Sequence, residues 1–178
     1  MNAPGQFLKQ KNNQTNMNYL GFDKAKVTPV VSELNSLLCN YHIYYQNLRN
    51  FHWNIQGENF FELHNQFENL YNDARLKIDE VAERILTLRH RPLSRLTDYL
   101  TISTIPEATL IEEDRDMVLI ILENHKVIIA NLREVIKLAS EAEDEGTVDM
   151  AGGFLESLEK KSWMLDAWTT RKLTPVVA

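Results

Sequence analysis

The stretch FHWNIQGENFFELHNQFENLYNDARLKIDEVAER, residues 51–84, decides the fold and carries most of the candidate chemistry. It contains two histidines twelve residues apart, His52 and His64, and two carboxylates four residues apart, Asp79 and Glu83. Imidazole and carboxylate groups together are a usual ligand set for iron, zinc and manganese. The question raised by the sequence is whether these four side chains can meet.

Apolar residues on both sides of Gly57 recur every three or four positions, which is the pattern of a helix with one buried face. Before this glycine the pattern runs from Val30 to Ile55, and Thr28 followed by Pro29 predicts the helix start. His52 lies on the apolar face near the end of this helix. The glycine then marks a turn.

A second helix is predicted from Phe60 to Leu88, ending before Pro92. Asn59 can cap its first turn, and Glu62, three residues later, can reach back to the same turn. Because the connection between the two helices is only a few residues long, we expect them to be antiparallel neighbours.

Residues 89–112 form a longer connection with turn signals at its prolines, and residues 94–102 predict a short helix within it. Two more long helices are predicted at about 113–143 and 148–172, the last one capped by Thr147. Four long amphipathic helices with a long central crossover predict an all-α, ferritin-like four-helix bundle with a short extra helix in the crossover.

The composition indicates one soluble domain, with the bundle at residues 27–172, a flexible basic tail at 1–26 and a short tail at 173–178. Cys39 is the only cysteine, which fits a reducing compartment, and no segment has the length of a membrane span. The first 26 residues lack the apolar region of a secretory signal. We therefore expect a cytoplasmic protein.

The geometry of the candidate ligands argues against a metal site within one chain. The sequence has no Glu-x-x-His, the pattern by which di-iron bundles bind metal in their core. His64 and Asp79 are fifteen residues apart, or about 22 Å along a helix. Metal–ligand bonds are only about 2 Å long. One chain therefore cannot close a site from both ends of the same helix.

The carboxylate pair is predicted to point away from the apolar face of its helix. One interpretation is an ordinary solvated surface. However, Phe61, Ala82 and Leu86 share that face, and such a mixture suits a two-fold interface. There, each subunit's histidines would meet the other subunit's carboxylates. Three other residues are interpreted as packing residues. His125 lies on the apolar face of the third long helix, and Cys39 and His42 lie beside the apolar face of the first helix.

These residues carry a resemblance to the Dps family, the DNA-binding proteins from starved cells, also called miniferritins. The elements that match are His52-Trp53-Asn54, Leu63-His64 and Ala82-Glu83-Arg84, at the family's spacing, with a second block at residues 144–149 and Trp163-Met164-Leu165. The resemblance covers about residues 28–172. One departure is Arg89-His90-Arg91 before Pro92, where the family commonly has two glycines.

The resemblance implies a hollow shell of twelve subunits with iron sites at two-fold interfaces. His52 and His64 would come from one subunit, and Asp79 and Glu83 from its neighbour. Glu68 matches a position that supports a second, weaker iron or a bridging water, and Trp53 would lie beside the site. The resemblance also implies a ferroxidase, because members of the family oxidise Fe(II), preferentially with hydrogen peroxide, and store the ferric product. Zinc is expected as a substitute for iron at the same site.

Two further sets of charged residues carry alternative interpretations. Glu141, Asp144 and Asp149 suit a negatively lined pore for Fe(II), or else a solvated helix end. The lysines of the N-terminal segment suit DNA binding, or else a solubilising tail; they are Lys9, Lys11, Lys24 and Lys26. The net charge of −6 weakens the DNA interpretation, so a nucleoid-binding protein remains the alternative to an iron-oxidising one.

Overall fold

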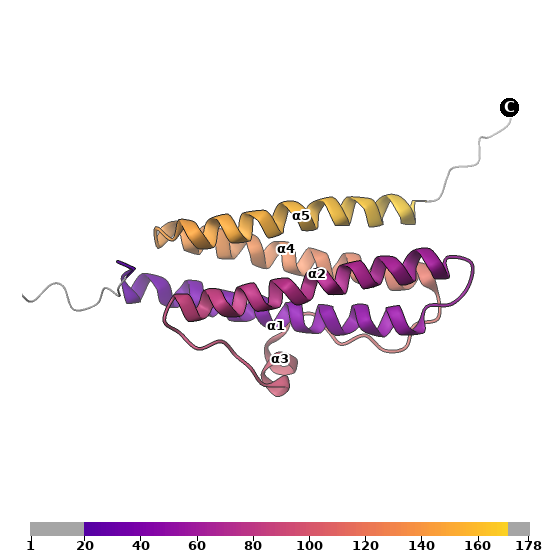
Figure 1. Ribbon diagram of the computed structural model, residues 1–178, viewed down its shortest axis with the longest axis horizontal. Coiled ribbons are helices and arrows are strands. Elements are labelled where there is room, and N and C mark those ends of the chain that lie inside the picture. The colour runs from indigo at the N-terminus through magenta and orange to yellow at the C-terminus, as the bar shows by residue number, and fades with distance from the viewer. Residues whose placement is uncertain (1–19, 171–178) are drawn as a thin grey trace, which may run out of the picture.

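The computed structural model describes residues 20–170 of the chain. Four long helices lie side by side along one axis: α1 (Lys24–Asn54), α2 (Phe60–Thr87), α4 (Asp114–Glu141) and α5 (Glu145–Thr169) (Figure 1). The short helix α3 (Leu96–Ile102) lies in the crossover between α2 and α4, against α1. The predicted bundle with a helix in its crossover is confirmed. No helix among the described residues is long and apolar enough to cross a membrane.

Helix α1 begins earlier than the sequence predicted. Asp23 caps it, because its carboxylate accepts a hydrogen bond from the backbone N–H of Ala25 at 2.9 Å. Aspartate is a better cap than threonine, and the Thr28 hydroxyl instead donates to the Lys24 carbonyl at 2.8 Å. Lys24 and Lys26 are therefore exposed on the first turn of α1 and do not belong to a tail. Lys9 and Lys11 lie outside the described residues.

Two other helix starts also differ from the sequence prediction. The Asn59 side chain makes no capping bond to α2; its amide donates to Asp114 at 2.7 Å and so joins the starts of α2 and α4. Helix α5 is capped by Asp144, whose Oδ1 accepts from the Thr147 backbone N–H at 3.1 Å. In both cases the side chain that forms the contact could only be identified once the neighbouring helix was in place.

The core lies between the four long helices, and the predicted apolar faces line it. The apolar repeat of α1 includes Tyr45 by its spacing, but the neighbouring Tyr44 is the buried one. Lys77 is buried on α2 within the apolar repeat. Two adjacent glycines inside a helix, Gly152 and Gly153, predict close packing on another backbone, because each costs about 1 kcal/mol relative to alanine. Within the described chain, a Cβ added at either position would meet nothing within 4 Å, so that packing is not found there.

Candidate metal centre

The turn between α1 and α2 brings His52 and His64 face to face, with ring centroids 3.8 Å apart. The Nδ1 atom of His52 lies 2.9 Å from the His64 carbonyl oxygen, and Nδ1 of His64 lies 2.9 Å from the His52 carbonyl oxygen. A carbonyl oxygen can only accept, so each Nδ1 carries the proton and donates. Both imidazoles therefore present the lone pair on Nε2, which is the form that binds a metal.

Glu68 completes a cluster of three candidate ligands. It lies one turn after His64 on α2, and one ligand atom each from His52, His64 and Glu68 fall within 4.8 Å of one another. Among the described residues this is the one group of three metal-ligating side chains. Two imidazole nitrogens and one carboxylate oxygen form a mixed donor set, which suits iron or zinc and leaves positions for further ligands.

Aromatic side chains surround this cluster. The Phe60 ring stacks on His64 at 5.0 Å, and the edge of the Tyr71 ring faces His52 at 5.3 Å. Trp53 follows His52 in the chain and is 60% exposed, with the Arg49 guanidinium 4.5 Å from the centre of its ring. The histidines are thus held by packing as well as by hydrogen bonds, while Trp53 stands at the surface beside them.

Asp79 and Glu83 lie on the same helix but outside this cluster. Both are exposed on the outer face of α2. Two apolar side chains share that face and are also exposed, Phe61 at 80% and Leu86 at 54%. A single chain therefore assembles three of the five predicted ligands and leaves the other two among exposed apolar residues.

Comparisons with known proteins identify the family of the chain. A ferritin-like domain family matches residues 31–173. The DNA protection during starvation protein of Porphyromonas gingivalis is 42% identical over 151 residues, which cover 85% of this chain and 95% of that protein. This chain belongs to the Dps family of ferritin-like proteins. The Dps crystal structure from Vibrio cholerae, described as a member of a broad superfamily of ferritin-like diiron-carboxylate proteins, is 40% identical, with a TM-score of 0.86 over 89% of this chain and 99% of that one. A Dps structure from Bacillus brevis is 36% identical, with a TM-score of 0.81 over 83% of this chain and 99% of that one.

In this Dps chain the three acids predicted to line a pore have different surroundings. Glu141 and Asp149 are exposed around the turn between α4 and α5. Asp144 is 0% exposed and forms an ion pair with Arg84 of α2, while the Thr147 hydroxyl donates to it at 2.5 Å. The Asp144 carboxylate is therefore used inside the chain, where it caps α5 and ties it to α2.

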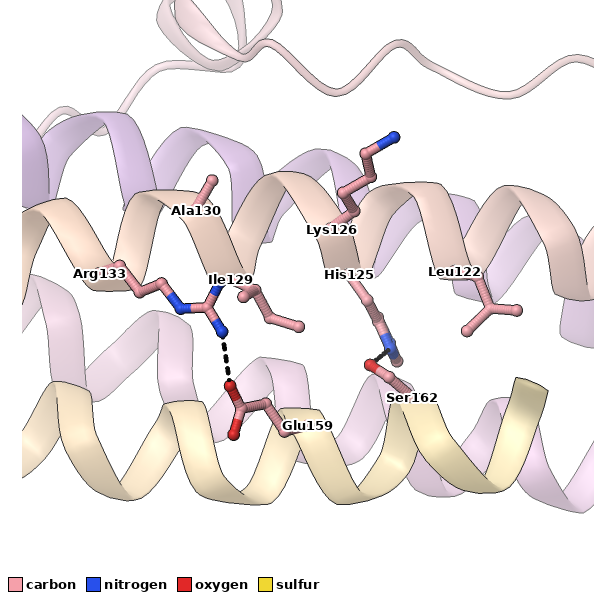
Figure 2. A pocket seen from close by; sticks show the side chains of 8 residues that line it. All are labelled: Leu122, His125, Lys126, Ile129, Ala130, Arg133, Glu159 and Ser162. Carbon is pink, nitrogen blue, oxygen red and sulfur yellow. Dashed lines mark hydrogen bonds and ion pairs between the residues drawn. The ribbon is translucent and has the colours of Figure 1, made fainter. Parts of the chain in front are cut away.

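His125 is buried between α4 and α5, as the packing interpretation expected (Figure 2). Ser162 donates to the Leu158 carbonyl at 2.7 Å, so its oxygen accepts from the His125 Nδ1–H at 2.8 Å. The Tyr44 hydroxyl donates to Nε2 at 2.7 Å. Burial lowers the pKa of His125 to about 3, so the ring is neutral and both of its nitrogens are occupied.

A second polar group, which contains the buried Lys77 and the half-buried Asp73, was missed by the sequence reasoning. Asp73 forms ion pairs with Lys77 of the same helix at 2.6 Å and with Lys161 of α5 at 2.7 Å. Burial raises the pKa of Asp73, but the hydrogen bonds from both lysines outweigh it and leave that pKa lowered. Burial lowers the pKa of Lys77. The sequence feature that could have predicted this ion pair is Lys77, a lysine within an apolar repeat, four residues after an aspartate.

Proposed function

We propose that this chain is a miniferritin that oxidises Fe(II), with hydrogen peroxide as the preferred oxidant, and stores the ferric product in a shell of twelve subunits. The observation that carries this proposal is the half-site of His52, His64 and Glu68, whose ligand atoms lie within 4.8 Å of one another. Two of those ligands are fixed in the metal-binding tautomer by backbone carbonyls. The diiron-carboxylate description of the Vibrio cholerae relative supports iron as the substrate.

The missing ligands are proposed to come from the α2 helix of a two-fold partner. When two copies of one helix pack antiparallel, a single register fixes every opposing pair. The register that sets His64 opposite Glu83 also sets Glu68 opposite Asp79, and it sets the exposed Phe61 opposite the exposed Leu86. One arrangement thus completes the ligand set and buries the apolar side chains that a single chain leaves exposed.

The proposed reaction consumes two Fe(II) ions and one hydrogen peroxide. Each iron gives up one electron, the O–O bond breaks, and two protons complete two water molecules. The carboxylates Glu68, Asp79 and Glu83 stabilise the higher charge of the ferric product, and the imidazoles favour Fe(II) binding.

Trp53, beside the histidines, is proposed to intercept stray oxidants. Zinc would compete for the same donors, and Glu141 and Asp149 remain proposed for iron entry.

The sharing of a site between subunits can be tested by complementation. We expect His52→Ala/His64→Ala and Asp79→Ala/Glu83→Ala each to abolish peroxide-driven Fe(II) oxidation. When the two variants are unfolded, mixed in equal amounts and refolded together, half of the random dimers contain both chains. Each mixed dimer has one intact site and one doubly defective site, so we expect about a quarter of wild-type activity to return.

The control for this experiment is to mix the two variants after each has assembled, which should restore nothing. An inactive co-refolded mixture that has formed mixed oligomers would show that the site is not shared. Wild-type activity in either variant alone would refute the ligand assignment, and so would a wild-type monomer that still oxidises iron.

DNA binding is a second candidate function, supported by the name of the Porphyromonas gingivalis relative and by the exposed Lys24 and Lys26 at the start of α1. It would place the protein at the nucleoid, within the proposed cytoplasmic location. Removal of residues 1–19, combined with Lys24→Ala and Lys26→Ala, takes all four lysines from the N-terminal segment. It is expected to abolish retardation of DNA at low salt and to leave iron oxidation unchanged. Retardation that persists would exclude this segment as the main DNA-binding element.

A further inference from the structure

Tyr71 contacts two members of the three-ligand cluster at once. It lies on α2, three residues after Glu68, and its hydroxyl donates to Glu68 Oε1 at 3.2 Å. The edge of its ring faces the His52 ring at 5.3 Å and 81°. The Tyr45 ring of α1 packs against Tyr71 at 6.0 Å and 89°. The phenol is therefore held between α1 and α2, with its hydroxyl directed at a carboxylate ligand.

We propose that Tyr71 is a positioning residue of the iron site, an inference that rests on the proposed function. A glutamate side chain has three rotatable bonds, and holding it in one orientation costs conformational entropy. The Tyr71 hydroxyl fixes Glu68 through one oxygen and leaves the other oxygen for the metal. Glu68 is then already oriented to bind the metal through that second oxygen, so less entropy is lost when the metal binds.

The hydroxyl and the ring of Tyr71 have separable roles. The ring packs against His52, and a phenylalanine would keep that contact. Only the hydroxyl reaches Glu68. Hydrogen-bond partners of metal ligands are typically worth about 10- to 100-fold in metal affinity. Tyr71→Phe therefore removes the positioning of Glu68 alone, whereas Tyr71→Leu also removes the support of His52.

The test is an anaerobic titration of the assembled protein with Co²⁺, followed by visible absorption. For Tyr71→Phe we expect about ten-fold weaker Co²⁺ binding and an altered visible spectrum, because the Glu68 ligand is no longer oriented. In steady-state iron oxidation, KM for Fe(II) should rise while kcat at saturating iron stays within about two-fold of wild type. Tyr71→Leu should weaken Co²⁺ binding further.

The matched control is Tyr99→Phe, which removes one phenol hydroxyl that donates to the Leu93 carbonyl at 3.2 Å, away from the cluster. It should leave the Co²⁺ titration unchanged. A Tyr71→Phe titration and spectrum identical to wild type would overturn the positioning role, even in a protein that oxidises iron normally. If the wild type failed to oxidise iron, the proposed function would fail, while the Co²⁺ titration would still decide the role of Tyr71.

Discussion

The corner between α1 and α2 and the interior between α4 and α5 both hold buried histidine, but they use it differently. At the corner, His52 and His64 each donate from Nδ1 to a backbone carbonyl and keep the Nε2 lone pair. In the interior, His125 is hydrogen-bonded through both nitrogens, by Tyr44 and Ser162. Burial and an apolar helix face are common to both regions and do not separate them.

The difference lies in how the hydrogen-bonding capacity of each group is used. A neutral imidazole has one donor and one acceptor, and a metal needs the acceptor. His125 has used its acceptor within the bundle, so its contribution is to stability. The corner histidines have used only their donors, so they are prepared for an external ligand. The same distinction separates the buried Asp144 from the exposed Asp79 and Glu83.

The largest effect is expected at the corner. His64→Ala removes one Nε2 ligand, and we expect the rate of peroxide-driven Fe(II) oxidation to fall at least about 100-fold. This exceeds the effect of removing a hydrogen-bond partner of a ligand, which is about 10- to 100-fold. Stopped-flow absorbance of the ferric product measures this rate. His125→Phe, assayed at equal concentration of folded protein, should keep wild-type activity. Comparable losses in both variants would erase the distinction between the two regions.

The next largest effect concerns stability. Asp144→Ala leaves the Arg84 guanidinium, with a side chain 19% exposed, without its buried partner. Breaking a buried ion pair in this way costs about 3–5 kcal/mol, which chemical unfolding at fixed protein concentration would detect. Glu141→Ala, at an exposed position of the same turn, should stay within about 0.5 kcal/mol of wild type. If the Asp144→Ala protein were as stable as wild type but took up iron more slowly, Asp144 would instead be assigned to the iron-entry pore.

The sequence predicted the bundle, which is confirmed, because helix formation depends on local spacing. The ligand assignment stays a prediction, although the structure brings His52, His64 and Glu68 together. The apolar repeats placed the helices, and helix arithmetic showed that His64 and Asp79 could not share a metal within one chain. The sequence could not predict contacts between distant residues. Tyr44 meets His125 across 81 positions, and Asn59 meets Asp114 across 55. Such partners depend on how the helices pack, which no local pattern records.

Helix starts show the same limit at short range. The sequence predicted Thr28 as the cap of α1, because Pro29 follows it. The structure uses Asp23 instead and accommodates Pro29 inside the helix. For α5, Thr147 and Asp144 are both capping residues, and the ion pair of Asp144 with Arg84 of α2 favours the aspartate.

A smaller effect should follow from removing the donor to His125. Tyr44→Phe leaves the buried Nε2 acceptor without a partner, and we expect a loss of about 1–3 kcal/mol in the free energy of unfolding. The double variant Tyr44→Phe/His125→Phe removes both partners, so its loss should be smaller than the sum of the two single losses. Strict additivity would mean that the two side chains do not interact as the hydrogen bond implies.

The last effect is a pH dependence of stability that the interior histidine should produce. Burial lowers the pKa of His125 to about 3 from the ordinary 6.5, with smaller contributions from the Lys161 and Lys77 charges that lower it and from Asp73 that raises it. Below pH 6.5 the unfolded chain therefore binds a proton that the folded chain does not. This contribution to stability is complete above pH 6.5 and is lost progressively as the pH falls toward 3, by at most about 1.4 kcal/mol per pH unit.

The pH dependence can be isolated by comparing wild type with His125→Phe in chemical unfolding between pH 7 and pH 5, at fixed protein concentration. Other groups that titrate in this range, such as His42 with a pKa lowered by burial to about 4, contribute equally to both proteins. The difference in unfolding free energy between the two proteins should therefore shrink as the pH falls, because only the wild type loses the His125 contribution. A difference that stays constant with pH would mean that His125 can accept a proton while folded, and the bundle would then not hold it as a neutral ring through both of its nitrogens.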